Sequence, residues 1–224
     1  MSLADPASPS PAVPAFAAPQ TDCQLCPRLA GYRTTNRRLN PEWFNAPVPA
    51  FGPLSARLLV VGMAPGLKGA NRTGRPFTGD HAGILLYQSL LRFGLAAGTY
   101  GADPADGLAL LSCRVTNAVR CAPPANAPQP AEVIACNRFL AAEMGAMPML
   151  RAVLALGVLA HAAVLKVFGL PASRPRFRHG AIHDLADGLL LADSYHVSRY
   201  NTSTGRLTAE MFEAALRGLL QRLG

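Results

Sequence analysis

Short apolar runs, each followed by a glycine-rich or polar segment, constrain the fold of this chain more than any other feature. Residues 57–62 form a β-branched run that ends in glycine, and three later runs are similar, at residues 115–119, 153–156 and 189–192. Such runs are typical of strands buried on both faces of a parallel sheet. Helices are predicted between and after them, over residues 84–93, from Pro130, from Gly157 to about Phe168, and over residues 204–223.

Strands that alternate with helices predict an α/β fold in which helices cover both faces of one parallel sheet. The four runs predict a central four-stranded sheet. Because the chain has 224 residues and half of them are hydrophobic, it can bury one substantial core. We therefore expect a single folded domain over residues 22–224.

The first 21 residues have a different character from the rest of the chain. They are rich in proline, alanine and serine and show no hydrophobic periodicity, which predicts a disordered tail over residues 1–21. They have neither a basic start nor a long apolar run, so a signal peptide or membrane anchor is not expected. We expect no membrane association and a cytoplasmic protein of the bacterial cytosol or nucleoid that acts as a monomer.

The charge of the chain is strongly basic. Lysine and arginine outnumber aspartate and glutamate by 21 to 13, which gives a net charge of +8. Such an excess suits a polyanionic partner, because each phosphate that is neutralised releases counterions. A basic composition common to all proteins of the source organism would give the same net charge without a polyanionic partner. Charge alone therefore does not decide whether nucleic acid is the partner.

Five cysteines in a chain expected in a reducing compartment argue against a disulfide framework. Cys23 and Cys26 form a CxxC pair before the first strand, and Cys121 and Cys136 follow the second. Four thiolates can bind zinc or an iron–sulfur cluster, and the spacing alone leaves both open beside unrelated burial. Cys113 lies in an apolar run and is expected to be a buried thiol.

Three polar segments follow predicted strands, at residues 63–80, 120–126 and 194–201. In open parallel sheets the ligand crevice lies outside the carboxyl ends of the strands, so we expect these segments to form one site. The glycines of the first segment resemble half of a P-loop. However, Arg75-Pro76 stands where the required Lys-Ser/Thr would be, which disfavours a nucleotide triphosphatase.

Motifs along nearly the whole chain resemble the iron–sulfur uracil-DNA glycosylases, families four and five of their superfamily. They are CxxCPRL with VRCAPPANAPQPAEVIAC, then GMAPG with GANRTGRPFTGD, and HVSRYN with TGRLT. The glycine-rich motif is closest to family five (type B). Family four has an acidic residue where this chain has Met63, and classical uracil glycosylases have an aspartate where it has Ala64.

The resemblance implies a DNA-repair enzyme that hydrolyses the N-glycosidic bond of uracil in DNA without a lyase step. Such enzymes flip the target nucleotide out of the duplex. The resemblance also implies tolerance of other deaminated bases, such as hypoxanthine and xanthine. It implies a [4Fe–4S] cluster with four cysteine ligands, Cys23, Cys26, Cys121 and Cys136.

Three residues are implied to be catalytic. Asp80 would stabilise the sugar cation and orient or deprotonate a water, and its alternative is to cap the helix that begins near Ala82. A neutral His196 would donate to the departing base, although a histidine at a strand end is often structural. Asn126 matches a family-five active-site position, and its alternative is a turn in a proline-rich loop.

The resemblance also implies a base pocket and a DNA surface. Phe77 would stack on the flipped base, although a lone loop phenylalanine often fills the core, and Asn117 would read the pyrimidine edge. The other pocket residues are Gly62, Ala64 and Gly66. The expected DNA contacts are Arg72, Arg75, Ser198, Arg199 and Asn201. Residues 176–180 form a second basic patch, which either contacts phosphates or is solvated surface.

Two other functions remain open at this point. A non-enzymatic nucleic-acid-binding module with a structural four-cysteine metal site would bind DNA without releasing a base. A redox protein would use the cluster for electron transfer. His81, His161 and His183 have no arrangement in the sequence that points to a role.

Overall fold

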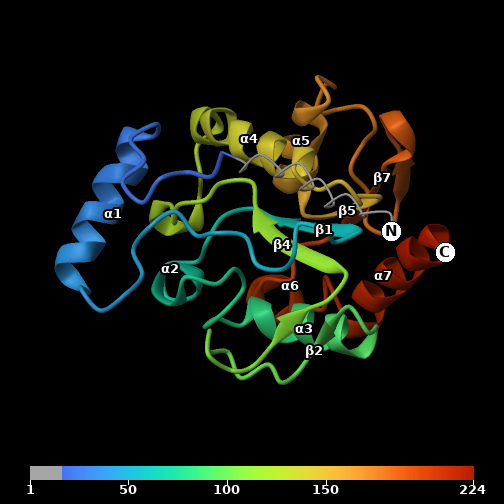
Figure 1. Cartoon of the computed structure of the whole chain (residues 1–224), viewed down its shortest axis with the longest axis horizontal. Coiled ribbons are helices and arrows are strands. Elements are labelled where there is room, and N and C mark those ends of the chain that lie inside the picture. The colour runs from blue at the N-terminus through green and yellow to red at the C-terminus, as the bar shows by residue number, and fades with distance from the viewer. Residues whose placement is uncertain (1–16) are drawn as a thin grey trace, which may run out of the picture.

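A computed structural model of the chain describes residues 17–224 (Figure 1). Its main sheet has five strands in the order β4-β1-β5-β7-β6. Their bounds are β1 Leu58–Gly62, β4 Cys113–Asn117, β5 Ala152–Leu156, β6 Ile182–Asp184 and β7 Leu190–Ser194. The first four strands in this order are parallel, and β6 pairs antiparallel with β7. The predicted tail lies outside the described residues except for residues 17–21.

The α/β fold is confirmed, but the predicted number of strands was wrong by one. The missed strand, β6, is three residues long, and its sequence Ile-His-Asp has no apolar run that would reveal it. The second strand also begins earlier than expected, at Cys113. Arg114 is buried inside this strand and pairs with Glu143, so a charged residue interrupted the apolar pattern.

Helices cover both faces of the sheet (Figure 1). The helices α4 (Pro130–Gly145) and α5 (Val158–Val167) lie on one face, and α3 (Ala82–Arg92) and α7 (Ala209–Leu223) lie on the other. Alternate side chains of β1 enter the two cores, Leu58 and Val60 toward α3 and α7 and Leu59 toward α4 and α5. All residues of β1 are buried, and the alternation of their side chains between the two faces follows from the pleat of a strand.

The ends of the helices follow local signals in the sequence. The helix predicted to start at Pro130 does so, and Gln129 and Glu132 form a capping box at its first turn. The final helix begins at Ala209 rather than at residue 204, because the Thr208 side chain accepts a hydrogen bond from Met211 N and caps it. The preceding residues form a short separate helix, α6 (Arg199–Ser203).

Smaller elements surround this core. They are the helices α1 (Pro27–Leu39) and α2 (Ala70–Thr73), the paired strands β2 (Ala96–Ala97) and β3 (Ala109–Leu110), and the 3-10 turns η1 (Pro124–Asn126) and η2 (Ala186–Gly188). Within residues 17–224, no helix has the length and apolar character needed to cross a membrane.

A buried ionic cluster fixes the chain that leaves β4. Glu143 of α4 is fully buried and accepts hydrogen bonds from Arg114 Nε, at 2.7 Å, from the Thr116 hydroxyl, at 3.1 Å, and from Arg120. A buried charge is tolerated only where it is paired and hydrogen-bonded, and this carboxylate has three donors. The cluster therefore sets the position of Cys121, the residue after Arg120.

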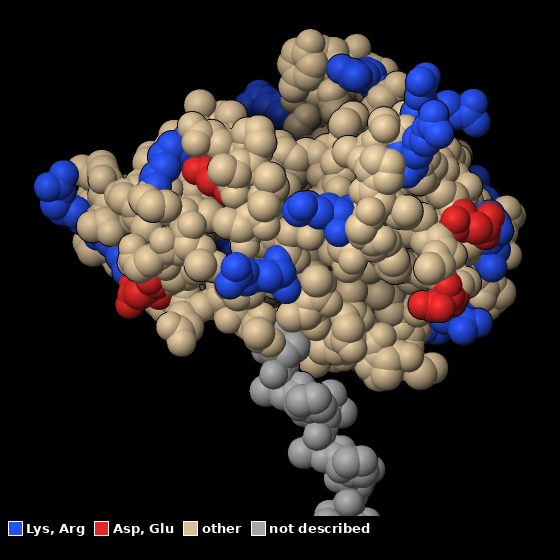
Figure 2. Space-filling view, turned by 90° about the horizontal axis from the view of Figure 1, so that it is seen from above, with Lys and Arg blue, Asp and Glu red and all other residues tan. Residues whose placement is uncertain are grey.

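The basic excess of the sequence is visible at the surface. Figure 2 shows a face on which lysine and arginine side chains outnumber aspartate and glutamate, with a close group of basic side chains at its upper right. Seven arginines of the described residues form ion pairs with carboxylates. Exposed basic side chains outside these pairs contribute to a positive surface field.

Candidate active site

A cleft of about 760 Å³ lies at the carboxyl ends of the parallel strands, where the sequence predicted a site. It is lined by residues from 63–82, from 156–159 and from 196–200, together with Asn117 and Asn126. Segments that follow β1, β4, β5 and β7 therefore meet there. The volume is within the usual range of small-molecule sites and exceeds the space needed by one flat base.

Asp80 lies in this cleft with its carboxylate against two glycines. A methyl group at Gly66 would lie 2.6 Å from Asp80 Oδ2, and one at Gly69 would overlap the same oxygen. Asp80 Oδ1 accepts a hydrogen bond of 3.1 Å from Ala82 N, so the residue also caps α3. The two predicted roles, cap and cleft carboxylate, thus occur together.

The environment of Asp80 changes its acidity. Burial raises the pKa of the Asp80 carboxyl above its usual range, and the hydrogen bond from Ala82 N–H and the nearby His81 oppose this rise. A carboxylate with a raised pKa is a stronger base than a solvated one. Gly66 and Gly69 have no side chain and so leave room for the carboxylate. The Ala82 N–H stabilises its ionised form.

Phe77 both fills the core and lines the cleft. It is 6% exposed, belongs to the core on the α3 side of the sheet, and has a positive φ of 52°. Non-glycine residues adopt this conformation only where the surroundings enforce it. A methyl group at Gly62 would clash with both the Phe77 ring and Asn117 Oδ1, so Gly62 is what allows these two side chains to meet.

Asn117, the last residue of β4, presents an unsatisfied acceptor at the cleft. Its side chain is buried, and Oδ1 has no hydrogen-bond donor among the described residues. A buried acceptor without a partner costs about 1–3 kcal/mol. A ligand that donates a hydrogen bond at this position would recover that free energy.

His196 follows β7 and is neutral at physiological pH. Burial lowers the pKa of its imidazole to about 4. Its ring lies 5.9 Å from the Phe77 ring, centroid to centroid, with a tilt of 31°. Asn201 donates a hydrogen bond of 2.8 Å to the His196 carbonyl, so Asn201 holds the backbone of the histidine. A neutral imidazole in this position can donate one hydrogen bond into the cleft.

Most of the other predicted pocket residues are also found there, but Gly62 lies outside the lining of the cleft. Ala64 and Gly66 line it, and Asn126 reaches it from η1 through two successive positive φ angles, at Ala125 and Asn126. Ser198 caps α6 by accepting a hydrogen bond from Asn201 N at 3.4 Å.

The rim of the cleft carries exposed side chains. Arg199 is exposed and lines the opening. Tyr200 also lines it and is 70% exposed, yet the sequence suggested no role for this residue. The one feature of the sequence that could have indicated a role for Tyr200 is its position between Arg199 and Asn201 in the third motif. Arg72 is exposed but hydrogen-bonds to Lys68 O at 2.9 Å and does not line the cleft.

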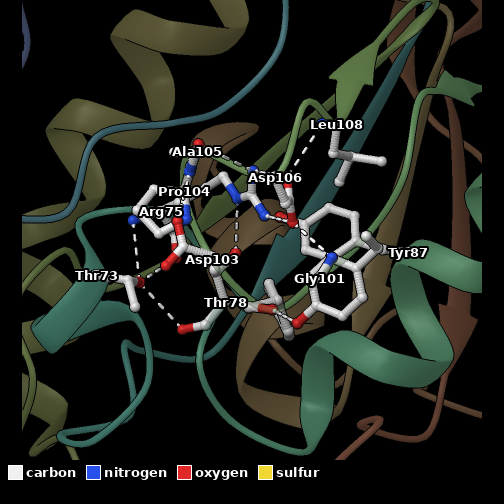
Figure 3. Close-up of polar contacts among 12 residues, drawn as sticks. Thr73, Arg75, Thr78, Tyr87, Gly101, Asp103, Pro104, Ala105, Asp106 and Leu108 are labelled. Carbon is white, nitrogen blue, oxygen red and sulfur yellow. Dashed lines mark hydrogen bonds and ion pairs between the residues drawn. The ribbon is translucent and has the colours of Figure 1, made fainter.

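The expectation that Arg75 contacts DNA is wrong. Its side chain is buried and binds both carboxylate oxygens of Asp106, at 2.8 and 2.6 Å, and the Thr78 hydroxyl at 2.8 Å (Figure 3). The guanidinium also lies 5.1–5.9 Å from three aromatic ring centroids, those of Phe51, Tyr87 and Tyr100. Arg75 is a structural residue that fixes the loop carrying Phe77.

Four cysteines form a second candidate site on the outer side of the β4 loop. Cys23, Cys26, Cys121 and Cys136 line one small cavity beneath α1. Arg33 donates to Cys121 Sγ at 3.5 Å, and Arg120 N donates to Cys136 Sγ at 3.4 Å. Burial raises the pKa of the Cys121 thiol to about 11 and that of Cys136 to about 12, and these two hydrogen bonds act in the opposite direction. Cys113 lies apart from them, fully buried in β4, as predicted.

The spacing of these sulfur atoms separates two kinds of metal site. Within residues 17–224, the only group of three or more potential ligand atoms that lie within 4.8 Å of one another is His161, His183 and Asp193. No three of the four cysteine sulfurs therefore lie within 4.8 Å of one another, whereas a tetrahedron of 2.3 Å Zn–S bonds would place all four roughly 3.8 Å apart. A wider donor set fits a cluster better than a single zinc ion.

Comparison with known proteins identifies the family of the chain. The family model of the uracil DNA glycosylase superfamily matches residues 49–220. The type-5 uracil-DNA glycosylase of Thermus thermophilus is 49% identical over 204 residues, which cover 88% of this chain and 92% of that protein. The type-5 uracil-DNA glycosylase of Mycobacterium leprae is 44% identical, with 92% and 93% covered.

A type-4 relative is more distant. The type-4 uracil-DNA glycosylase of Pyrobaculum aerophilum is 33% identical over 154 residues, which cover 68% of this chain and 64% of that protein. On the family match and these identities, the chain belongs to the uracil DNA glycosylase superfamily.

Proposed function

We propose that this protein is a monofunctional uracil-DNA glycosylase, a hydrolase that removes uracil from DNA. The observation that carries the proposal is the convergence of Asp80, Asn117, Phe77 and His196 on one cleft at the carboxyl edge of the sheet. The relatives named type-5 uracil-DNA glycosylases support the same substrate.

The proposed chemistry begins with cleavage of the bond between the sugar and the base. Positive charge then develops on the sugar, and the Asp80 carboxylate stabilises it and accepts a proton from the attacking water. The raised pKa of Asp80 favours proton acceptance, and the hydrogen bond from Ala82 N–H holds the carboxylate in its ionised form. Asn126, which lines the same cleft, would orient the water.

The departing base is held by three side chains. The Phe77 ring offers a face for stacking, which offsets the stacking lost when the nucleotide leaves the duplex. The unsatisfied Asn117 Oδ1 accepts a hydrogen bond from the ring N–H of uracil. The neutral His196 donates to the base carbonyl on which negative charge develops.

A hydrolytic rather than a lyase reaction is supported by the residues of the cleft. A lyase step needs an amine nucleophile that forms a Schiff base with the sugar. No lysine is among the described residues that line the cleft. Water is then the nucleophile, and an abasic site is the product.

The cleft supports a wider range of bases. Ala64 and Gly66 occupy positions that larger side chains would fill, and the volume of about 760 Å³ leaves room for a purine. We include hypoxanthine and xanthine among the proposed substrates, as deaminated bases with the same N–H and carbonyl edge as uracil.

A [4Fe–4S] cluster bound by Cys23, Cys26, Cys121 and Cys136 completes the proposal. The wide spacing of the sulfurs and the two donors to them support it. The cluster would supply a structural crosslink between the segment before α1, the loop after β4 and helix α4. We further propose that the protein acts as a monomer in the bacterial cytoplasm, with DNA as its partner.

The direct test is an excision assay on a labelled duplex that contains one uracil, with alkali used to break the abasic product. Iron-loaded native protein should cleave, and Asp80→Ala should not, because the sugar cation loses its counterion. Asp187→Asn is a matched control, since Asp187 is an exposed acid in η2. Its activity should equal that of the native protein.

Three outcomes are distinguishable. Full activity of Asp80→Ala would mean that another residue supplies the catalytic carboxylate. Cleavage of uracil but of neither purine would restrict the substrate range. No cleavage of uracil, hypoxanthine or xanthine by iron-loaded protein would overturn the enzymatic function and leave a DNA-binding module.

A further inference from the structure

The segment of residues 174–180, here called the arginine segment, joins α5 to β6 and lies outside the cleft described above. Its side chains alternate in exposure. Arg174, Arg176 and Arg178 are exposed, and Pro175, Phe177 and His179 between them are half-buried. Extended chains send successive side chains to opposite sides, so one side of this segment faces the protein and the other presents three arginines.

The inner side is attached to the end of β7. Arg178 N donates to Asp193 Oδ2 at 3.1 Å, and Gly180 N donates to the Asp193 carbonyl at 2.8 Å. Tyr195 N donates to His179 Nδ1 at 3.1 Å, and the two rings stack with centroids 4.8 Å apart and planes 9° apart. The backbone of the arginine segment is therefore held at several points.

A buried cluster supports this attachment. His161 is fully buried, with Nδ1 2.7 Å from Asp193 Oδ1 and Nε2 2.9 Å from the Pro175 carbonyl. Burial acts to lower the pKa of His161, but the hydrogen bonds to Asp193 and to the Pro175 carbonyl outweigh it and raise that pKa. His183 Nε2 lies 3.0 Å from Asp193 Oδ2. Hydrogen bonds thus account for the close approach of these three groups, and Pro175 is fixed through His161.

The arginine segment lies beside the catalytic cleft. His179 stacks on Tyr195, and the next residue, His196, lines the cleft. Arg206 lies 4.9 Å above the same Tyr195 ring. In Figure 1 the chain between α5 and β7 lies at the top of the view.

The arginines of this region lack acidic partners. Among the ion pairs of the described residues, none involves Arg174, Arg176 or Arg178, and none involves Arg199 or Arg206. Like charges on one side of a rigid segment repel one another, and a ligand with regularly spaced negative charges relieves that repulsion. The DNA backbone is such a ligand, and arginine binds phosphate in two-pronged geometry.

We propose that the arginine segment is a DNA-backbone contact that binds phosphates beside the flipped nucleotide, with Asp193 and His161 as the residues that position it. The inference rests on the proposed function, because it assumes that DNA occupies the neighbouring cleft. The segment reads no sequence, since phosphate contacts fix the register of the duplex and carry no base information.

The test measures binding of the iron-loaded protein to a short undamaged duplex by fluorescence anisotropy at several salt concentrations. The variant is Arg174→Gln/Arg176→Gln/Arg178→Gln. Each phosphate contact contributes about 0.9 to the slope of log K against log salt, so the slope should fall by up to about 2.7. Over a fourfold rise in salt, the native protein should then lose up to about 40-fold more affinity than the variant.

A matched control removes the same charge elsewhere. Arg138, Arg151 and Lys166 are exposed and have no ion pair within the part of the chain that the structure describes. Their triple glutamine variant should keep the native salt slope, which separates local contact from net charge. Melting temperature and iron content of both variants verify that the fold is intact.

The outcomes separate this inference from the proposed function. If the arginine-segment variant binds DNA with the same slope of log K against log salt as the native protein, the inference is overturned and the proposed function stands. An equal loss of slope in both triple variants would also overturn it, since net charge would explain the effect. Absence of DNA binding by the native protein would instead refute the proposed function on which the inference rests.

Discussion

The buried pair of Arg75 and Asp106 allows a quantitative prediction about the loop that carries Phe77. In Asp106→Asn, the guanidinium would lose the carboxylate that binds two of its nitrogens at 2.8 and 2.6 Å. Both side chains are about 5% exposed. Removing one partner from a buried ion pair costs about 3–5 kcal/mol, because the other charge is left without compensation.

The surroundings place this substitution near the lower end of that range. The three aromatic rings around the guanidinium remain and stabilise the cation, each by about 0.5–2 kcal/mol. We therefore expect Asp106→Asn to lower the free energy of unfolding by about 3 kcal/mol. For a domain of this size that corresponds to a fall in melting temperature of about 6–12 °C.

The pH dependence of this contribution has a defined sign. The Arg75 guanidinium holds the pKa of the Asp106 carboxyl well below its usual range. A depressed pKa in the folded state stabilises the protein above the unfolded pKa of about 4, and the contribution is lost as the pH falls through the folded value. The difference between native protein and Asp106→Asn should therefore be full at neutral pH and shrink in acid.

The assay is thermal and denaturant unfolding of iron-loaded protein, with Asp184→Asn as control. Asp184 makes the same kind of ion pair with Arg222, but those side chains are 70% and 45% exposed. Exposed pairs contribute about 0–1 kcal/mol, so the control should be nearly neutral. Equal effects of the two substitutions would refute the assignment of Arg75 as a buried structural cation.

The remaining predictions concern the cleft, the cysteines and the buried histidine. Gly69→Ala should lower single-turnover excision about 100-fold, because its methyl group displaces the Asp80 carboxylate, and Gly145→Ala, with open space around it, should not. Cys121→Ser should lose iron and folded protein, since metal binding is coupled to folding, whereas Cys113→Ala should keep its iron; an iron-free, active Cys121→Ser would contradict this. The raised pKa of His161 means that its contribution to stability is full below about pH 6.5 and is lost as the pH rises through the folded value. The difference in unfolding free energy between native protein and His161→Asn should shrink as the pH rises through the folded pKa, and a difference independent of pH would contradict the raised pKa.

The sequence was enough to predict that the three motif segments lie together, because this prediction needs only the direction of each strand. Once the strands are parallel, every segment that follows a strand emerges at the same edge of the sheet. Asp80, Asn117, Asn126 and His196 therefore met in one cleft as expected. Their proposed roles remain predictions, since the position of a side chain does not establish its chemistry.

The errors have a common origin in partners that are distant along the chain. Arg75 looked like a loop cation, and its partner Asp106 is 31 residues away. The Asn201 side chain donates to the His196 backbone, and its expected contact with DNA stays a prediction. No local signal existed for His161, because Asp193 and Pro175 meet it only after α5 packs beside β7.

The sequence by itself determined the α/β class, the edge of the sheet that carries the site and the identity of the candidate catalytic residues, because periodicity and motifs are properties of neighbouring residues. Tertiary structure decided which charges are buried and which are free. The cationic side chains of Arg75 and Arg178 look alike in the sequence, yet one is enclosed by Asp106 and aromatic rings and the other is exposed. Burial depends on what packs against a residue from elsewhere in the chain, and only the folded structure supplies that information.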